Sequence, residues 1–348
     1  MNKRLPPHTF NIPVERIREG FFSDKYFSRT RDILRMDGND SSVVMQVFAR
    51  QNGVLCGIDE AIAVIRLCAD SPEELKISAL YDGDRVSKNE TVLCIEGAYR
   101  TFAHLETVYL GVLARGTSVA TGVRRTIEAA AGKTVLFFSS RFDHYTNQSG
   151  DGYAAFIGGA HGVSTDANGL YTGTAGTGTI PHGLIAAYNG STVEACRAFS
   201  EHAGPDVRLI ALVDFENDCI RTSLEAARRF ASRLWGVRLD TAGDMRDVSV
   251  RSRGDDSYGV CPELVFKLRE ALDEEGFGHV RIVLSGGFDE AKLAKFMELG
   301  VPFDAVGVGS AYYRLRIDFT ADVVMVNGRH CAKAGRVYNP NPRLRENC

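Results

Sequence analysis

Two glycine-ended stretches decide the fold of this chain: Leu284-Ser285-Gly286-Gly287-Phe288-Asp289 and Ala305-Val306-Gly307-Val308-Gly309-Ser310. Each includes the end of a short apolar run that is typical of a strand. Between them, residues 290–299 carry apolar side chains at helical spacing. A strand, a helix and a second strand in this order predict two neighbouring parallel strands whose carboxyl ends both run into glycines.

Strand ends of this kind can bind a phosphate group. Glycine leaves backbone N–H groups uncovered, and two such turns side by side would form a double cradle for one phosphate. The alternative is that Gly286, Gly287, Gly307 and Gly309 serve only the geometry of two tight turns. We favour the phosphate hypothesis because the pair is similar to the phosphate grip of many (β/α) barrels.

The order of strand, polar loop and helix repeats over residues 118–314. This number of units over about 200 residues favours a barrel over an open sheet. We therefore predict an α/β fold, with an irregular parallel (β/α) barrel at 118–314 and an N-terminal α+β sandwich domain at 1–117 that the C-terminal segment 315–348 completes. The predicted barrel strands are 134–138, 161–164, 209–214, 237–240, 280–284 and 305–308, with helices at 223–234 and 262–274; the first domain has helices at 60–68 and 104–114 and a strand at 91–97.

The bulk properties are those of a globular cytoplasmic enzyme. Hydrophobic residues make up 44% of the chain, charged residues make up 24%, and the formal net charge is −3. This charge gives no footprint for nucleic acid or an anionic membrane, and no apolar run approaches the roughly 18 residues that span a bilayer. The start, from Met1 to Pro7, lacks the apolar stretch of a secretory signal. The scattered cysteines, without a CxxC pair, favour reduced thiols.

Polar side chains follow the predicted barrel strands at their carboxyl ends, where such barrels keep their active sites. A guanidinium binds a carboxylate in bidentate fashion, and carboxylates accept hydrogen bonds from ribose hydroxyls or hold Mg²⁺. The arginine and the carboxylates at these strand ends therefore predict a phosphorylated sugar and an anionic partner as ligands. Helix capping is the alternative for any single carboxylate, such as Asp214 or Asp218. The strand-end residues are Ser139, Ser140, Arg141, His144, Ser164, Thr165, Asp214, Glu216, Asn217, Asp218, Asp240, Thr241 and Asp244.

A loop rich in glycine and threonine, residues 172–181, precedes His182. The loop has neither a Walker A nor a GxGxxG pattern. By composition alone it would be a surface loop, and His182 alone would be a single histidine of structural type.

Taken together, these segments resemble the nicotinate phosphoribosyltransferase family of type II phosphoribosyltransferases, and in particular its shorter archaeal and bacterial branch. The resemblance covers nearly the whole chain and rests on six motifs in the expected order. They are Ser23-Asp24-Lys25-Tyr26-Phe27 (family pattern T-D-x-Y-F), Tyr81-Asp82-Gly83-Asp84, Ile95-Glu96-Gly97-Ala98-Tyr99, Gly178-Thr179-Ile180-Pro181-His182 (G-T-M-P-H), Val237-Arg238-Leu239-Asp240-Thr241 (V-R-L-D-[ST]), and Ser285-Gly286-Gly287 with Gly307-Val308-Gly309.

The resemblance implies that nicotinate reacts with phosphoribosyl pyrophosphate and Mg²⁺ to give nicotinate mononucleotide and pyrophosphate, in NAD biosynthesis or salvage. Catalysis of this kind depends on positioning and on electrostatic stabilisation of a ribosyl oxocarbenium ion. His182 matches the histidine that ATP phosphorylates in family members that couple hydrolysis to synthesis. The alternative for His182 is a structural or pyrophosphate-binding role without phosphorylation.

By the same resemblance, Arg141 would clamp the nicotinate carboxylate and Phe138 would stack on the pyridine ring. Tyr26 would cover the other ring face from a neighbouring subunit, so the site would need a homodimer. Ser164 stands where nicotinamide-using relatives carry an aspartate, and its neutral side chain does not repel nicotinate. The remaining implied roles are the 5′-phosphate contacts of Gly286, Gly287, Gly307 and Gly309, a phosphate or ribose contact of Arg238, the ribose contacts of Asp240 beside it, and a ribose or Mg²⁺ contact of Asp214, with His182, Asp214 and Asp240 as the catalytic set.

The chain departs from the family pattern at three places. Phe142 stands where many members have a second arginine or histidine, and Phe215 replaces a threonine after Asp214. A family stretch with arginines is matched only loosely by Arg246, Arg251 and Arg253. These departures keep two alternatives open: a type II transferase for quinolinate or nicotinamide, and a ligand-binding homologue without turnover.

Overall fold

The computed structural model describes residues 4–254 and 257–346. Its chain divides into two compact units, the first made of residues 1–122, 153–158 and 313–348 and the second of residues 123–152 and 159–312. The predicted domains had boundaries at 117/118 and 314/315, and the segment 153–158 was not expected in the first unit. Residues 1–3 of the predicted N-terminal domain and Cys348, one of the scattered cysteines, lie outside the described residues.

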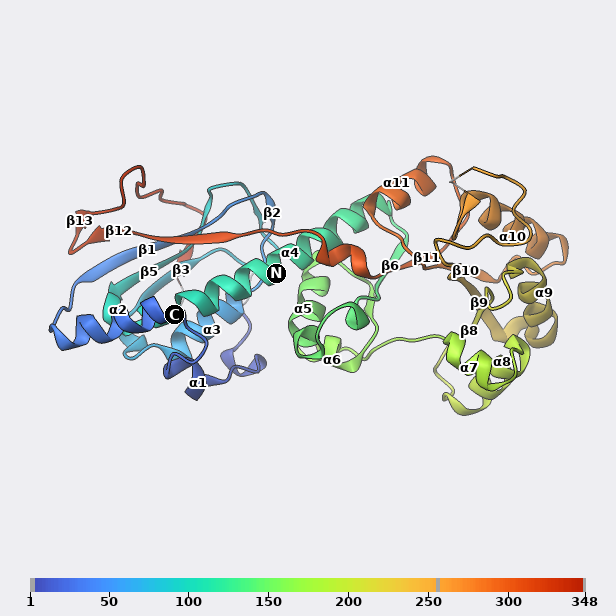
Figure 1. The fold of residues 1–348 in the computed structure, drawn as a ribbon, viewed down its shortest axis with the longest axis horizontal. Helices are drawn as coiled ribbons and strands as arrows, with labels where there is room; N and C mark the ends of the chain where they lie inside the picture. The colour runs from blue at the N-terminus through green and yellow to red at the C-terminus, as the bar shows by residue number, and fades with distance from the viewer. Residues whose placement is uncertain (1–3, 255–256, 347–348) are drawn as a thin grey trace. The chain divides into compact units, whose positions relative to one another are not determined.

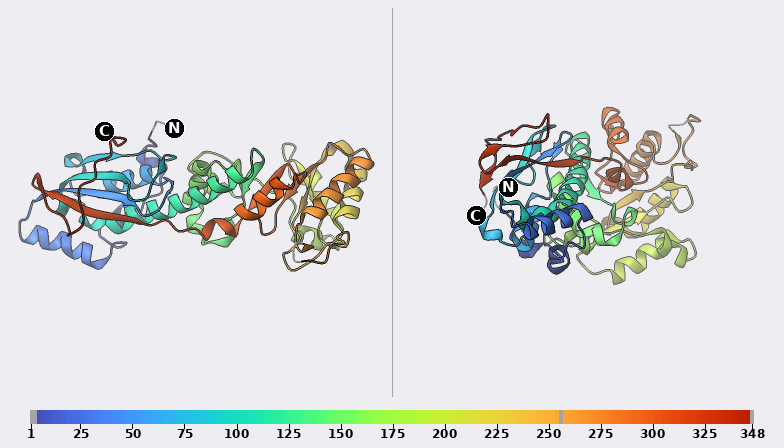
Figure 2. Two further views of the ribbon diagram at one scale, coloured as in Figure 1. Left: turned by 90° about the horizontal axis from the view of Figure 1, so that it is seen from above. Right: turned by 60° about the vertical axis from the view of Figure 1, so that its left-hand side comes forward.

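The first unit is built on a six-stranded antiparallel sheet in the order β13-β12-β1-β5-β3-β14 (Figure 1). The C-terminal strand β12 pairs along β1, from Val326 opposite Val43 to Phe319 opposite Ala49, and the two strands lie side by side in Figure 2. This pairing confirms that the C-terminal segment completes the N-terminal sheet. The strands are β1 (Ser42–Ala49), β3 (Lys76–Ala79), β5 (Thr91–Ala98), β12 (Phe319–Val326), β13 (Arg329–His330) and β14 (Arg345–Glu346), and a separate pair is formed by β2 (Gly53–Val54) and β4 (Arg85–Val86).

Helices pack on the apolar face of this sheet. Alternate strand residues such as Met45 and Ile95 are buried in one cluster with Ile65 of α3 (Ile58–Cys68) and Tyr109 of α4. The predicted helix at 60–68 is confirmed, but the predicted helix at 104–114 is too short. Helix α4 (Glu106–Ala129) continues because buried residues recur at helical spacing beyond that point. Two further helices, α1 (Val14–Arg18) and α2 (Lys25–Met36), precede β1.

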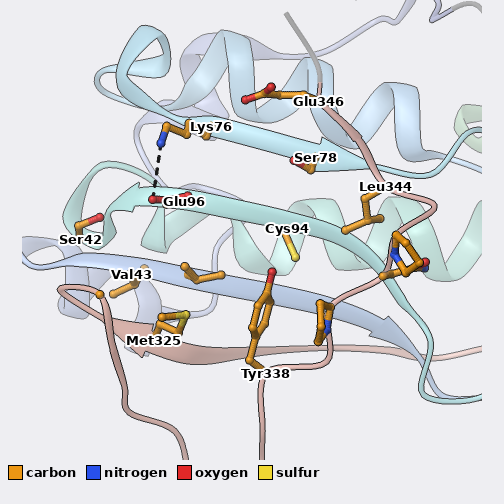
Figure 3. Close-up of a pocket in the computed structure, with 15 residues that line it drawn as sticks. Ser42, Val43, Lys76, Ser78, Cys94, Glu96, Met325, Tyr338, Leu344 and Glu346 are labelled. Atoms are coloured by element: carbon orange, nitrogen blue, oxygen red, sulfur yellow. Dashed lines mark ion pairs between the residues drawn. The ribbon is translucent and has the colours of Figure 1, made fainter.

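The C-terminal residues 337–344 cross the other face of the sheet before β14 joins its edge. The Gln46 side chain donates to the Val337 carbonyl (3.0 Å) and accepts from the Asn339 N–H (3.0 Å). A cavity of about 860 Å³ remains between this segment and the strands (Figure 3). Its lining includes Cys94, Tyr338 and the Lys76–Glu96 ion pair (3.8 Å). None of the residues singled out above as site candidates lines this cavity.

The second unit contains a parallel sheet of six strands in the order β7-β6-β11-β10-β9-β8. This is the order of a closed ring of consecutive strands that has been opened between β7 and β8, since no pairing among the described residues joins these two. The arrangement confirms the predicted α/β class and corresponds to an incomplete barrel. The strands are β6 (Thr134–Phe137), β7 (Gly162–Val163), β8 (Leu209–Leu212), β9 (Leu234–Leu239), β10 (Arg281–Leu284) and β11 (Ala305–Val308).

Helices alternate with these strands, and one of them lies elsewhere than predicted. The predicted helix at 223–234 begins at Cys219 and ends at Phe230. Asp218 starts it early by accepting a hydrogen bond from the Arg221 N–H (3.3 Å), and Leu234 already belongs to β9. The helices are α5 (Gln148–Gly158), α6 (Asp166–Gly169), α7 (His182–Ala187), α8 (Thr192–His202), α9 (Cys219–Phe230), α10 (Pro262–Glu274) and α11 (Glu290–Glu298).

The two faces of the parallel sheet differ in the size of their side chains. One face is fully apolar and buried, with residues such as Phe137, Leu239 and Val306. The other face carries a glycine on each of three strands, Gly162 of β7, Gly236 of β9 and Gly307 of β11, and a cavity of about 760 Å³ lies against it. Leu136, Val283 and Ile210 line this cavity from three different strands. The small side chains therefore leave a hollow where a closed barrel would be filled.

No helix in the described part of the chain has the length and apolar character needed to cross a membrane.

Glu106, at the start of α4, gives a prediction about pH and stability. Burial raises the pKa of its carboxyl from 4.5 to about 8, with smaller contributions from Asp322 and Asp24. Between these two values the folded chain holds a proton that the unfolded chain has lost, so stability falls as the pH rises. Glu106→Gln keeps the shape of the protonated side chain and removes this loss. The difference in free energy of unfolding between Glu106→Gln and the wild type should therefore grow in favour of the variant by roughly 1.4 kcal/mol per pH unit between pH 5 and 8.

The measurement is denaturant unfolding of both proteins at pH 5.5 and 7.5. Glu73→Gln, at an exposed position, is the matched control and should show no such trend. An equal offset of Glu106→Gln from the wild type at both pH values would contradict the burial of this carboxyl.

Candidate active site

The carboxyl ends of the parallel strands bring the candidate residues to one edge of the second unit. Neighbouring parallel strands place paired residues on the same face, and Leu212, Arg238 and Val283 are paired across β8, β9 and β10. Two residues further along each strand, the side chains of Asp214, Asp240 and Ser285 therefore project from that same face. This is the face that carries the cavity, since Val283 lines it.

Arg238 is the centre of a hydrogen-bond network at this edge. Its Nη1 donates to Asp240 Oδ2 (3.2 Å) and to Ser285 Oγ (3.1 Å), and its Nη2 donates to the Ile180 carbonyl (3.2 Å). The Ser285 hydroxyl also donates to Asp240 Oδ1 (2.8 Å). Asp240 is therefore fixed by two donors, one of them charged. Sequence patterns singled out Arg238 and Asp240, but they gave no sign that Ser285 joins the two.

His182 and Asp214 form a second pair at the same edge. The His182 Nε2 lies 3.1 Å from Oδ1 and 3.0 Å from Oδ2 of Asp214. His182 opens α7 and is half exposed, whereas Asp214 is buried. Burial raises the pKa of Asp214, and the hydrogen bond from His182 opposes that shift. The structure thus brings together two of the residues predicted to be catalytic.

Phe215 has a packing role beside this pair. A side-chain atom added at Gly190 would lie 3.3 Å from the Phe215 ring, so the ring lies against the turn that follows α7. The departure from the family pattern at this position therefore places an apolar contact next to the His182–Asp214 pair.

A separate polar network closes the ends of β6 and β7. The Ser140 and Ser164 hydroxyls are hydrogen-bonded to each other (2.9 Å), and Ser140 also donates to the buried Asn168. Asn168 in turn donates to the Gln148 carbonyl (2.8 Å). Ser164 is therefore held in place by neutral partners. Asn168 and Gln148 were not predicted from the sequence, because nothing in their local pattern distinguishes them from other loop and helix residues.

Phe138 and Arg141 follow β6. Phe138 is half-buried and lines the cavity, whereas Arg141 is exposed and lies over the Phe142 ring, 5.3 Å from its centre. The structure thus places the predicted ring-stacking residue at the cavity, whereas the predicted carboxylate clamp, three residues later, is not among the residues that line it. Their roles remain predictions.

The first glycine turn is open. Gly286 and Gly287 have positive φ values of 85° and 71°, a backbone conformation that residues other than glycine rarely adopt. In the described part of the chain, the N–H groups of these two glycines make no hydrogen bond. An atom added at Gly287 would meet nothing within 4 Å. This turn has the free donors and the space that a phosphate needs.

The second glycine turn is filled by aromatic rings. A Cβ at Gly307 would overlap the Phe138 ring, and one at Gly309 would overlap the Phe142 ring. Glycine is therefore required here by close packing against these rings and not by the backbone conformation of a tight turn, since neither residue has a positive φ. The phosphate contact of Gly307 and Gly309 stays a prediction.

Tyr26 belongs to the first unit, on α2, and is 60% exposed. Its ring lies against Phe27, with centroids 4.3 Å apart. The predicted contact of Tyr26 with the pyridine ring of a neighbouring subunit stays a prediction.

This edge can bind anions and stabilise positive charge. Free backbone N–H groups suit a phosphate, and two fixed carboxylates suit a cationic sugar. Among the described residues, no group of three or more His, Cys, Asp and Glu side chains is arranged to hold a metal ion. Asp214 and Asp240 could each supply one carboxylate ligand, so most ligands of a Mg²⁺ ion would have to come from its anionic substrate.

Comparisons with known proteins agree with this arrangement. The family model for the N-terminal domain of quinolinate phosphoribosyl transferase matches residues 24–117. A nicotinate phosphoribosyltransferase of Mycobacterium tuberculosis is 26% identical over 328 residues, covering 84% of this chain and 68% of the relative. The crystal structure of nicotinate-nucleotide pyrophosphorylase from Pyrococcus furiosus has a TM-score of 0.82 and 32% identity, covering 95% of this chain and 82% of that chain. Human nicotinic acid phosphoribosyltransferase shares the fold, with a TM-score of 0.68 and 15% identity over 91% of this chain and 77% of that chain.

The fold and its strand-end site define a type II phosphoribosyltransferase. The chain belongs to the nicotinate phosphoribosyltransferase family and is an enzyme of that family.

The close approach of Phe138 to Gly307 can be tested by a double-mutant cycle. Gly307→Ala forces the ring to move, and overpacking of this kind typically costs about 1–3 kcal/mol of stability. Phe138→Ala makes room for the new methyl group, so the double variant should lose less than the sum of the single variants. Thermal and denaturant unfolding measure these losses. Gly111→Ala, at a helical position with nothing within 4 Å, is the control and should be neutral or stabilising. Additive losses would show that the ring and the glycine are not in contact.

Proposed function

We propose that this enzyme joins nicotinate to phosphoribosyl pyrophosphate and releases nicotinate mononucleotide and pyrophosphate, as a step of NAD synthesis. The observation that carries the proposal is the convergence of residues from separate family motifs on one sheet edge. His182, Asp214, Arg238 and Asp240 are joined there by hydrogen bonds, directly or through the backbone of the loop that precedes His182. The names of the relatives supply the substrates.

The reaction uses the chain mainly to position two substrates. The pyridine nitrogen would form a bond to C1 of the ribose as the bond from C1 to pyrophosphate breaks, and the pyrophosphate keeps the electron pair. Positive charge develops on the sugar in between. The carboxylates of Asp240 and Asp214 are fixed by hydrogen bonds before the substrate binds, so they can stabilise this charge without reorganising.

The 5′-phosphate would lie at the turn of Gly286 and Gly287, whose N–H groups are free donors. Gly307 and Gly309 would contribute to the same site through their backbone, next to the rings of Phe138 and Phe142.

The base would lie between Arg141, Phe138 and Ser164. The Arg141 guanidinium would bind the carboxylate, and the neutral pair of Ser164 and Ser140 would leave that carboxylate unopposed by negative charge. We also propose that the enzyme works in the cytoplasm as a homo-oligomer, in which Tyr26 of one subunit reaches the base site of another. The exposure of Tyr26 is compatible with such a contact.

ATP and Mg²⁺ complete the proposal. When bound, Mg²⁺ would neutralise the charge of the pyrophosphate, with Asp214 as a candidate ligand. ATP would phosphorylate His182, whose imidazole is half exposed and is oriented by Asp214. A carboxylate on one ring nitrogen fixes the orientation of the imidazole and leaves the other nitrogen available to a phosphoryl group.

Quinolinate is the second candidate substrate. It is favoured by the family model that matches residues 24–117, which describes a quinolinate enzyme. Quinolinate carries a second carboxylate, which is lost as CO₂ during transfer, and its pocket should hold more than one cation. The candidates for these cationic side chains are Arg141 and His144, which both follow β6.

Pyrophosphate release with nicotinate, nicotinamide and quinolinate, each with and without ATP, tests the proposal. We expect turnover with nicotinate, stimulation by ATP, and little turnover with nicotinamide. Release of CO₂ and pyrophosphate from quinolinate, with no reaction of nicotinate, would replace the proposal by the second candidate.

Arg141→Ala tests the base site. The loss of a charged hydrogen bond typically costs about 1.5–3 kcal/mol, so the KM for nicotinate should rise roughly 10- to 150-fold. The KM for phosphoribosyl pyrophosphate should change little. Arg229→Ala is the matched control, because Arg229 also lies over the phenyl ring that follows it. Steady-state kinetics with an unchanged nicotinate KM would remove Arg141 from the base site.

The phosphorylation of His182 can be tested by labelling. We expect γ-labelled ATP to transfer an acid-labile phosphoryl group to the wild type and to His202→Asn, a variant of another exposed histidine. His182→Asn should not be labelled. Labelling of His182→Asn at the wild-type level would assign the phosphoryl group to another residue.

A further inference from the structure

The side chain of Arg238 joins two parts of the site that lie far apart in the sequence. Its Nη1 is occupied by Asp240 and Ser285, which belong to the strand ends. Its Nη2 reaches the backbone carbonyl of Ile180, in the loop before His182. The guanidinium is mostly buried, with 12% of the side chain exposed. Three of its Nη hydrogens are thus used within the chain, whereas the family resemblance implied a ribose or phosphate contact for Arg238.

The loop before His182 has few other attachments. Its earlier part is fixed where the Thr177 N–H donates to the Val163 carbonyl (2.7 Å). Among the described residues, the bond from Arg238 to Ile180 is the only hydrogen bond that ties residues 178–181 to a strand. The Ile180 side chain is fully buried, which anchors the loop but does not by itself set the direction of its carbonyl. Two residues later, α7 begins with His182.

We propose that Arg238 is a positioning residue for the His182–Asp214 pair. By holding the Ile180 carbonyl, it fixes the backbone from which His182 reaches Asp214. The significance of this for catalysis rests on the proposed function, because that proposal assigns His182 the phosphoryl group. The physical claim that Arg238 sets the position of His182 does not depend on the proposed function.

The shape of the guanidinium explains why arginine suits this position. A planar fork with several N–H donors can serve Asp240, Ser285 and Ile180 at the same time. A lysine ammonium keeps the positive charge beside Asp240 but is a compact point charge on a flexible stem. Arg238→Lys should therefore keep the charge balance of the site and lose the hold on the loop.

The test measures the reaction of His182 with diethyl pyrocarbonate, followed by mass spectrometry of each histidine. In the wild type, Asp214 engages Nε2 of His182. In Arg238→Lys we expect His182 to react at least threefold faster, while the exposed His202 of the same unit reacts at the wild-type rate. Arg269→Lys is the matched control, because Arg269 also holds two backbone carbonyls, those of Val280 (2.8 Å) and Phe277 (3.2 Å), and in the described part of the chain contacts neither the loop nor the strand-end residues. It should leave His182 unchanged.

Asp214→Asn shows whether Arg238 acts through the pair. This variant should also increase the reactivity of His182, and adding Arg238→Lys to it should produce no further increase. An unchanged His182 rate in Arg238→Lys, or independent multiplicative effects of the two substitutions, would overturn the proposal. If Arg238→Lys fails to fold, Arg238→Gln takes its place with the same expectation, because one amide cannot serve both Asp240 and Ile180.

Turnover separates this inference from the proposed function. If both hold, Arg238→Lys lowers the ATP-stimulated kcat and leaves the nicotinate KM close to the wild-type value. If the enzyme uses another substrate, the reactivity of His182 still changes as described, because that measurement requires no substrate.

Discussion

The arrangement of the site depends on one constraint, the geometry of parallel strands. All strands of such a sheet end at the same edge, and side chains alternate between its two faces. On β9 this alternation sends Arg238 and Asp240 to the face that the register shares with Val283 of β10. The opposite face is apolar and buried under helices. Polar residues that are spread over more than a hundred positions of the chain can therefore meet at one edge without a dedicated binding domain.

Within this frame, the charges are arranged in pairs. Asp240 is balanced by Arg238, and Asp214 is balanced by His182 when that ring is protonated. Burial raises the pKa of Asp214, and the hydrogen bond with His182 opposes that shift and so favours negative charge where a cationic sugar would form. The glycine turn at Gly286 and Gly287 supplies the complementary feature, uncovered N–H groups for an anion. The site thus separates a region for positive charge from a region for phosphate along the same edge.

The sequence predicted the strands of the second unit well, because each is a short apolar run followed by polar or glycine residues. It also predicted the C-terminal completion of the first sheet. Helix limits were predicted less well: α9 starts at a cap formed by Asp218, and α4 runs on through residues that keep helical spacing. The contacts of Ser285, Asn168 and the Ile180 carbonyl could not be predicted, because they join residues from distant segments through side-chain or backbone atoms that leave no local pattern. The rings over Gly307 and Gly309 belong to the same class of unpredicted contact.

The central claim is that the open glycine turn after β10 receives the phosphate of the nucleotide. A crystal structure of the protein with nicotinate mononucleotide tests this most directly. The account predicts that the phosphate oxygens accept hydrogen bonds from the N–H groups of Gly286 and Gly287, with the ribose next to Asp240. A phosphate bound at any other place, with this turn still empty, would contradict it.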